Sequence, residues 1–336
     1  MTVGLGLIFL AVLLGPVLIR PIERNIEVFF LIAGTLASAL TGQWSTYLLR
    51  SVLTEPIALT IAVLVFGVIA RLARPTLDDR VKKLVGVVAP RWIYFGIIII
   101  LGLLSSVITA VVAALILVEV IALLKLDRES EIAAVVLACF AIGLGAALTP
   151  IGEPLSTIAR AALKVDFWYL ARLLGPLVIA GIVIVGTLSH FLPAKFGHAL
   201  KADAHLEGWS AIVLRAGKVY LFVAGLIALS AGLRPLVDTH VSRLPQGVLF
   251  WVNSVSAIVD NATLTAAEIG PSLTTMQQRA ILMALLISGG MLIPGNIPNI
   301  VAAERLEITS REWARVGLTA GLSLMLLCFA VLRWIG

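Results

Sequence analysis

The sequence predicts an all-α polytopic membrane protein, and its composition and apolar runs carry this prediction. Of 336 residues, 60% are hydrophobic and 13% are charged, whereas soluble domains have about half apolar and a quarter charged residues. The two cysteines, Cys139 and Cys328, lie inside apolar runs, which excludes a disulfide scaffold. Soluble enzymes and nucleic-acid-binding proteins are excluded for the whole chain. We expect the lipid bilayer as its surroundings and no nucleic-acid partner.

Simple membrane-spanning helices are expected where a run of about 20 apolar residues stands alone. Such runs fall near residues 3–19, 26–42, 54–72, 168–190, 216–233 and 312–332. The run 3–19 has no basic segment before it and no small-residue cleavage site after it. We therefore expect a retained span there rather than a signal peptide.

Four further apolar regions are interrupted by polar or helix-breaking residues. Residues 92–124 carry Ser105, Ser106 and Thr109 at their centre, and residues 244–270 carry a polar stretch from Asn253 to Thr265. Two other regions contain proline and glycine. Residues 131–164 are broken at Thr149-Pro150-Ile151-Gly152-Glu153-Pro154, and residues 278–308 at Pro294-Gly295-Asn296-Ile297-Pro298-Asn299. The two polar-centred regions are predicted to form re-entrant hairpins, and the two regions with proline and glycine are predicted to form broken transmembrane helices. Each half of the chain contains one of each.

The interruptions occur in the same order in both halves of the chain. Gly152 aligns with Gly295 at an offset of 143 residues, and Ser106 aligns with Ser254 at an offset of 148. Interrupted segments at corresponding places indicate an inverted-repeat transporter. The predicted parts are N-terminal scaffold helices (1–90), a first repeat (91–190; hairpin 91–124, broken helix 131–164, helix 168–190) and a second repeat (191–336; helix 216–233, hairpin 244–270, broken helix 278–308, helix 312–332).

Orientation is predicted from the basic residues. With two hairpins and eight crossings, the loops on one side hold 17 of the 25 lysines and arginines. These loops are 20–25, 71–91, 125–130, 191–218 and 303–315. That side is expected to be cytoplasmic, which places both termini outside. The membrane expected is a prokaryotic inner or cell membrane.

Two carboxylates fall on the interruptions, Glu153 in the first broken helix and Asp260 in the second hairpin. Broken backbone cannot face lipid, and an acid at membrane depth is a candidate ion site or proton relay. Both residues also have structural readings, a neutral acid at a helix end for Glu153 and a hairpin-tip cap for Asp260. The oxygens expected to complete a cation shell belong to Asn261, Thr149, Ser156, Thr157, Thr263, Asn296 and Asn299.

Other polar residues are secondary candidates. They are Ser105, Ser106, Thr109, Ser256, Glu119 and Glu268. Glu119 and Glu268 lie near segment ends, so we expect them to reach the solvated interface. Glu55, just before Pro56 at a span entrance, is expected to be a first-turn carboxylate favoured by the helix dipole.

The two motifs resemble those of a known superfamily. The stretch from Thr149 to Thr157 is similar to the Thr-Pro-Ile-Gly-Asp segment of NhaD-type Na⁺/H⁺ antiporters, and Ser256 to Thr263 is similar to their Ser-Ala-(apolar)₂-Asp-Asn segment. The ion transporter superfamily also holds anion/Na⁺ symporters and a short branch of cation transporters. The resemblance covers roughly residues 90–334 and implies a homodimer that moves its site across the membrane like an elevator. Glu153 stands where the antiporters have Asp, and the first hairpin has no Asp-Asn pair.

We expect a secondary transporter that exchanges Na⁺, or another small cation, for H⁺ at Glu153 and Asp260. The alternative is a Na⁺-coupled transporter of dicarboxylates or oxyanions, which the amides of the second break and the helix dipoles favour. An aspartyl protease needs two carboxyls that share a proton, normally both Asp, so no enzyme is expected. A channel is disfavoured by the paired breaks. No phosphate-binding loop is found, so neither a nucleotide nor another cofactor is expected.

Overall fold

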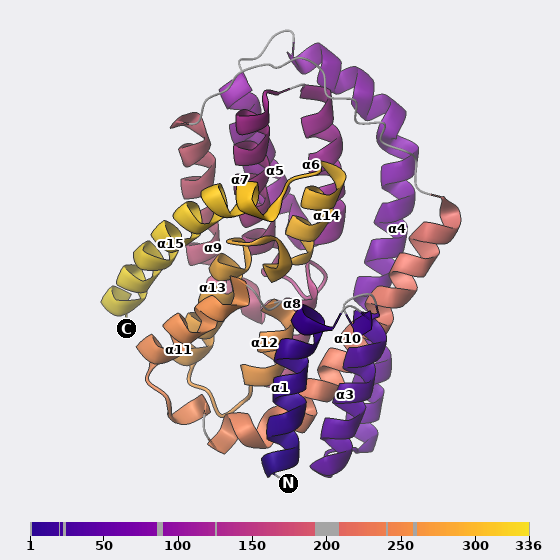
Figure 1. The fold of residues 1–336 in the computed structure, drawn as a ribbon, viewed down its shortest axis with the longest axis vertical. Helices are drawn as coiled ribbons and strands as arrows, with labels where there is room; N and C mark the ends of the chain where they lie inside the picture. Colours follow the sequence, from indigo (N-terminus) through magenta and orange to yellow (C-terminus); the bar gives the residue numbers. More distant parts are fainter. Residues whose placement is uncertain are drawn as a thin grey trace.

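A computed structural model describes residues 2–19, 21–22, 25–85, 90–124, 126–191, 208–239, 241–257 and 261–335. Regular structure within these ranges is helical (Figure 1). Six of the described helices are long and apolar enough to cross a membrane. They are α4 (Thr46–Val85), α5 (Pro90–Ile108), α7 (Arg128–Ala146), α9 (Tyr169–Leu188), α10 (Trp209–Thr239) and α15 (Ser310–Ile335). These helices indicate a multi-pass membrane protein, as the composition predicts.

The simple spans form helices near their predicted positions, although two are much longer than their apolar runs. Helices α1 (Thr2–Leu18) and α3 (Ile26–Leu40) cover the first two runs. Helix α4 extends far beyond 54–72, because the sequence after the apolar run is rich in Arg, Leu and Lys, which favour helix. Glu55 therefore lies in the third turn of α4, and the prediction of a first-turn carboxylate is wrong.

All four interrupted regions are divided where the sequence predicts. Region 92–124 forms α5 and α6 (Ala110–Leu124), which meet at Thr109 with a φ of 75°. Region 131–164 forms α7 and α8 (Pro154–Leu163). Region 244–270 forms α11 (Gln246–Val252), a 3-10 turn η3 (Asn253–Ala257) and α12 (Asn261–Glu268). Region 278–308 forms α13 (Thr275–Gly289), a 3-10 turn η4 (Ile293–Gly295) and α14 (Ile297–Arg305).

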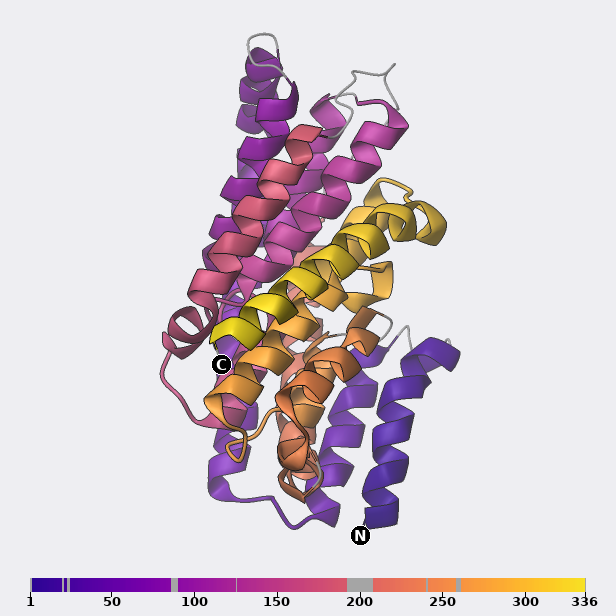
Figure 2. The same ribbon diagram turned by 90° about the vertical axis from the view of Figure 1, so that its left-hand side faces the viewer.

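The buried apolar side chains form two clusters. The smaller one, the N-terminal cluster, joins α1, α3, α4 and α10, with α8 and α12 contributing Ile158 and three alanines. The larger one, the broken-helix cluster, joins α5 to α9 and α11 to α15. In Figure 1 the helices of the N-terminal cluster lie at the right and lower right, and Figure 2 shows α15 running obliquely across the face turned away from α4. Helix α10 thus packs with the N-terminal helices, although it lies between the two halves in sequence.

Small residues let α3 and α10 approach closely. A Cβ at Gly34 would overlap the carbonyl oxygen of Gly225, and a Cβ at Gly225 would overlap the backbone at Leu31. The Ser38 hydroxyl donates to the Ala228 carbonyl over 2.6 Å. Close backbone approach of this kind holds membrane helices together where lipid supplies no hydrophobic driving force. Helices α3 and α10 are therefore in close backbone contact within the N-terminal cluster.

The two halves of the broken-helix cluster pack on each other in a reciprocal way. Helix α6, the second arm of α5–α6, contacts α14, whereas α12, the second arm of the η3–α12 segment, contacts α8. Helices α5 and α11 each contact the helix that precedes the break in their own half, α7 and α13 respectively. In Figure 1 α5 and α6 lie in the upper part of the molecule and α11 and α12 in the lower part. Most residues of both breaks are consequently buried or half-buried between helices, and Pro294 of the second break is exposed.

Candidate functional site

The first break, residues 147–153, separates α7 from α8. Helix α8 begins with Pro154 at its first position, where the missing N–H is not needed. Glu153 is the N-cap residue and has extended backbone, with φ −154° and ψ 162°. Its carboxylate is only 2% exposed. The sequence therefore places a buried acid at the N-terminus of a short helix.

The second break, residues 290–296, separates α13 from α14 and has the same length. Asn296 is the N-cap residue of α14, with φ −154° and ψ 149°, and Pro298 lies in the first turn. It follows Glu153 by 143 positions, the offset at which Gly152 aligns with Gly295. The two breaks thus share their backbone conformation, while an amide in the second replaces the acid in the first.

Contacts inside the two breaks correspond at the same offset. The Ser156 hydroxyl donates to the carbonyl of Ala146, the last residue of α7, over 3.5 Å. Asn299 Nδ2 donates over 2.8 Å to the carbonyl of Gly289, the last residue of α13. A Cβ at Gly152 or Gly295 would overlap the Ala146 and Gly289 carbonyl oxygens, respectively. Each break therefore folds back on the end of its preceding helix.

The α5–α6 tip is tied to the first break. The Ala110 amide donates to the Gly152 carbonyl over 2.8 Å, and the Thr149 hydroxyl donates to the Ser106 carbonyl. The Thr157 hydroxyl donates to the Pro150 carbonyl over 2.5 Å. Thr149 and Thr157 were predicted as ion ligands; their hydrogens satisfy carbonyls that the break leaves without helical partners.

Serines of the two interrupted segments also correspond. The Ser105 hydroxyl donates to the Ile142 carbonyl over 3.0 Å, and the Ser256 hydroxyl donates to the Leu285 carbonyl over 3.4 Å. Ile142 and Leu285 are again 143 positions apart, whereas the serines are 151 apart rather than the 148 of the sequence alignment. In this register Thr109 corresponds in sequence to Asp260. Asp260 itself lies outside the described residues.

A small cavity of about 20 Å³ collects three of the predicted residues. Thr109 from the α5–α6 tip, Glu153 from the first break and Asn296 from the second break line one side. Leu59 and Val63 of α4 and Val219 of α10 line the other. The cavity therefore lies between the N-terminal cluster and the broken-helix cluster, with its polar groups on the latter.

A second polar group gathers at the end of α13. Asn299 Nδ2 also donates to the Leu292 carbonyl over 2.9 Å, so its orientation is fixed by two carbonyls. Its buried Oδ1 has no hydrogen-bond partner among the described residues. A Cβ at Gly289 would lie 3.6 Å from Asn261 Nδ2. Asn261 and Asn299 therefore both lie beside Gly289 at the second break, and Thr263 is buried two residues further along α12.

The remaining candidates lie elsewhere. Glu119 is half-buried on α6 and Ser106 donates within α5 to the Leu103 carbonyl. Glu268 is buried and accepts a 2.8 Å hydrogen bond from Asn253 Nδ2. The expectation that Glu268 is solvated at the interface is therefore wrong, because the α11–α12 segment folds over it and supplies a buried amide donor.

Sequence reasoning missed one ion pair near the site. Arg160 on α8 pairs with Glu55 on α4, and both side chains are partly buried. The pair joins α8 to α4, four residues before the cavity residue Leu59 on α4, and neutralises the arginine that follows Glu153 along α8. The sequence shows Glu55 and Arg160 as single charged residues within apolar runs, which indicates that each needs a partner. It does not show that these two residues, 105 positions apart, are partners of each other.

The cavity has the chemistry of a hard-cation or proton site. Carboxylate, hydroxyl and amide oxygens are the ligands that such cations prefer. Burial makes an ionised carboxylate costly, whereas the N-termini of α8 and α14 carry partial positive charge that favours an anion. A proton or a small cation bound at Glu153 would each lower that cost.

Comparison with known proteins places the chain in a family. None of the curated proteins compared with the chain matches it. A family model matches residues 2–335, nearly the full length, including both breaks and the N-terminal cluster. The chain belongs to this family, DUF1646, described as a protein of unknown function.

Proposed function

We propose that the protein is a secondary transporter that exchanges Na⁺, or another small monovalent cation, for H⁺. One observation carries the proposal: a buried carboxylate, Glu153, lines a small cavity together with polar residues of two other interruptions, Thr109 and Asn296. A single carboxylate that binds either a proton or a cation couples the two ions by competition. Asp260, at the sequence position corresponding to Thr109, is the second proposed carboxylate.

The proposed inverted repeat is supported by the matching geometry of the halves. Helix ends, N-cap residues and intrabreak contacts recur at one offset of 143 residues. The α5–α6 tip meets the first break in the interior, and so we propose that α5–α6 and α11–α12 are re-entrant hairpins. Helix α5 is also long enough to cross a membrane, and cysteine labelling of the Thr109 tip from each side distinguishes the two arrangements.

An elevator-type movement is supported by the position of the cavity. Its apolar wall comes from α4 and α10, and its polar wall comes from the broken-helix cluster. If the broken-helix cluster slides against the N-terminal cluster, the polar wall and its ion move together. We propose that the N-terminal cluster forms the homodimer scaffold and that both termini face outward.

A second candidate function, Na⁺-coupled transport of an anion, is favoured by a specific observation. Helices α8 and α14 both begin at the cavity, at Glu153-Pro154 and Asn296-Ile297. Two helix N-termini form a favourable environment for a dicarboxylate or an oxyanion. Glu153 opposes this reading, because an ionised carboxylate in the same small cavity would repel the substrate.

Proteoliposomes with an internal pH indicator test the two functions. Addition of Na⁺ is expected to dissipate an imposed proton gradient, and Glu153→Gln is expected to abolish that response. Glu129→Gln, at an exposed carboxylate in the first turn of α7, serves as the control. Accumulation of a radiolabelled dicarboxylate with Na⁺, and no proton movement, would overturn the exchanger in favour of the anion transporter.

A further inference from the structure

A second pocket lies at the junction of the two clusters, away from the Glu153 cavity. It holds about 700 Å³ of empty space, part of it open to solvent. The α3–α4 loop, α4 and α10 form one wall, and the C-terminal end of α8 and the residues after α12 form the other. Its cavity volume is about 140 Å³, which is below the range of drug-sized ligand sites but leaves room for more than one water molecule.

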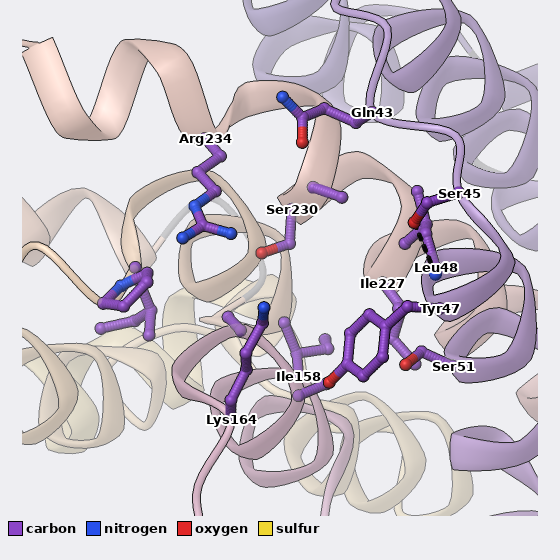
Figure 3. Close-up of a pocket in the computed structure, with 16 residues that line it drawn as sticks. Gln43, Ser45, Tyr47, Leu48, Ser51, Ile158, Lys164, Ile227, Ser230 and Arg234 are labelled. Carbon is purple, nitrogen blue, oxygen red and sulfur yellow. Dashed lines mark hydrogen bonds between the residues drawn. The ribbon is translucent and has the colours of Figure 1, made fainter.

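Two basic side chains from different clusters face this pocket. Figure 3 shows Lys164, Arg234 and Ser230 directed into the same space, with Gln43 and Ser45 at its rim. Lys164 follows the last turn of α8 in the left-handed conformation, and Arg234 lies near the end of α10. None of the described residues that line the pocket is acidic. The lining therefore has two positive charges and several hydrogen-bond donors.

The existing partners of these two cations are weak. Lys164 Nζ lies 4.9 Å from the centre of the Tyr47 ring, a cation–π contact that leaves its hydrogens available. Arg234 Nε lies 3.7 Å from Asp238 Oδ2 on the same helix, and both side chains are more than a third exposed. Exposed pairs of this kind contribute little to stability, so an incoming anion can replace Asp238 at Arg234.

We propose that this pocket binds an oxyanion, a phosphate or carboxylate group, through Lys164 and Arg234. Arginine and lysine together with hydroxyl donors match the oxygens of such a group. The apolar residues Leu48, Ile158 and Ile227 also line the pocket, so the ligand carries an apolar part beside its anionic group. The source is either a soluble anion or the headgroup of an anionic lipid.

A bound ligand would connect the two clusters. Lys164 follows α8, most of whose buried apolar residues belong to the broken-helix cluster, and Arg234 lies on α10 of the N-terminal cluster. One anion that contacts both would therefore bridge the surface along which we propose sliding. The site does not depend on the proposed transport function, because its occupancy is measured without transport. Failure of one proposal therefore leaves the other intact.

Binding is tested on the purified full chain with two probes. Native mass spectrometry from phosphatidylcholine nanodiscs with phosphatidylglycerol examines the lipid source, and thermal unfolding in detergent with inorganic phosphate, against chloride at equal ionic strength, examines the soluble source. Retained phosphatidylglycerol or stabilisation by phosphate is the expected result. The double variant Lys164→Gln with Arg234→Gln is expected to lose about 100-fold in affinity, about tenfold for each charge-assisted contact.

Arg243→Gln is the matched control, because it removes an exposed arginine just after α10 that does not line the pocket. It is expected to bind as the wild type does. If the double variant is unstable, Arg234→Gln alone carries the test with a tenfold loss. Equal binding of either probe by the wild type and the lysine and arginine variants, or no binding of either probe, overturns the proposal.

Discussion

At the first break the N-cap residue is Glu153, whereas at the second break it is Asn296, in the same backbone conformation and with the same helix ends around it. Both positions follow a glycine that packs on the end of the preceding helix, and both precede a proline in the first helical turn. The backbone frame and the chemical group are therefore specified by different residues. The frame is repeated, and the charge is not.

This difference matters for the charge that the cavity can hold. Two acids at corresponding N-caps would place two negative charges in a small cavity, where each would disfavour ionisation of the other. One acid and one amide give a single negative charge and a neutral oxygen. The two N-cap residues thus add one negative charge to the site, beside that of Asp260, the second proposed carboxylate.

The largest difference in proton flux is expected between substitutions of the two N-cap residues, Glu153 and Asn296. Glu153→Gln is expected to lower the Na⁺-dependent proton flux by at least about 100-fold, because it removes the one charge among the described residues that line the cavity. Asn296→Ala is expected to lower it by about tenfold, the cost of one neutral ligand. Initial rates in proteoliposomes measure both.

The exchanged variant, Glu153→Asn with Asn296→Glu, sharpens the same comparison. The acid then stands at the other N-cap of the same cavity, so flux above that of Glu153→Gln is expected. Equal flux from Glu153→Gln and the wild type would instead show that the carboxylate is structural.

Glycine substitutions test the backbone conformation that the two breaks share. A Cβ at Gly152 or Gly295 would overlap a carbonyl oxygen of the preceding helix, and so Gly152→Ala and Gly295→Ala are each expected to lower stability by about 2–3 kcal/mol. The Cβ of Gly217→Ala, in α10, meets no atom within 4 Å, so this control should match the wild type or be slightly more stable. Thermal unfolding in detergent checks the order, and a neutral effect at either break would contradict the proposed close packing.

The sequence predicted the frame better than it predicted the packing around it. Proline and glycine within apolar runs located both breaks, and the alignment of Gly152 with Gly295 paired them. Burial of Glu268 and the Glu55–Arg160 pair were not predicted, since both depend on contacts between segments far apart in sequence. Hydropathy shows where a helix can lie in a membrane, but not which helix it meets.

Helix lengths show the same limit. Helix α4 continues past its apolar run because helix propensity does not end where hydrophobicity ends. The place of α10 in the N-terminal cluster depends on close contacts of Gly34 and Gly225. Glycines are frequent in this chain, and a sequence alone does not show which of them lie at helix contacts.

The smallest difference, one of stability, is expected between substitutions of Ser156 and Asn299. Each of these residues holds one break to its preceding helix. Asn299 donates to two carbonyls, those of Gly289 and Leu292, over 2.8 and 2.9 Å. Ser156 donates to one carbonyl over 3.5 Å, at the limit of a hydrogen bond. Asn299→Ala is therefore expected to lower stability by about 2 kcal/mol, because it removes two hydrogen bonds, and Ser156→Ala by about 0.5 kcal/mol.

Thermal unfolding of the two alanine variants beside the wild type measures this difference. If Ser156→Ala costs as much as Asn299→Ala, the first break is held as firmly as the second, and the asymmetry does not extend beyond the N-cap. If the expected order holds, the break that carries the acid is held to its preceding helix more weakly than the second break is, while its hydrogen bonds to Ser106 and Ala110 remain. The α5–α6 tip, rather than the end of α7, would then fix the position of Glu153 during proton and cation exchange.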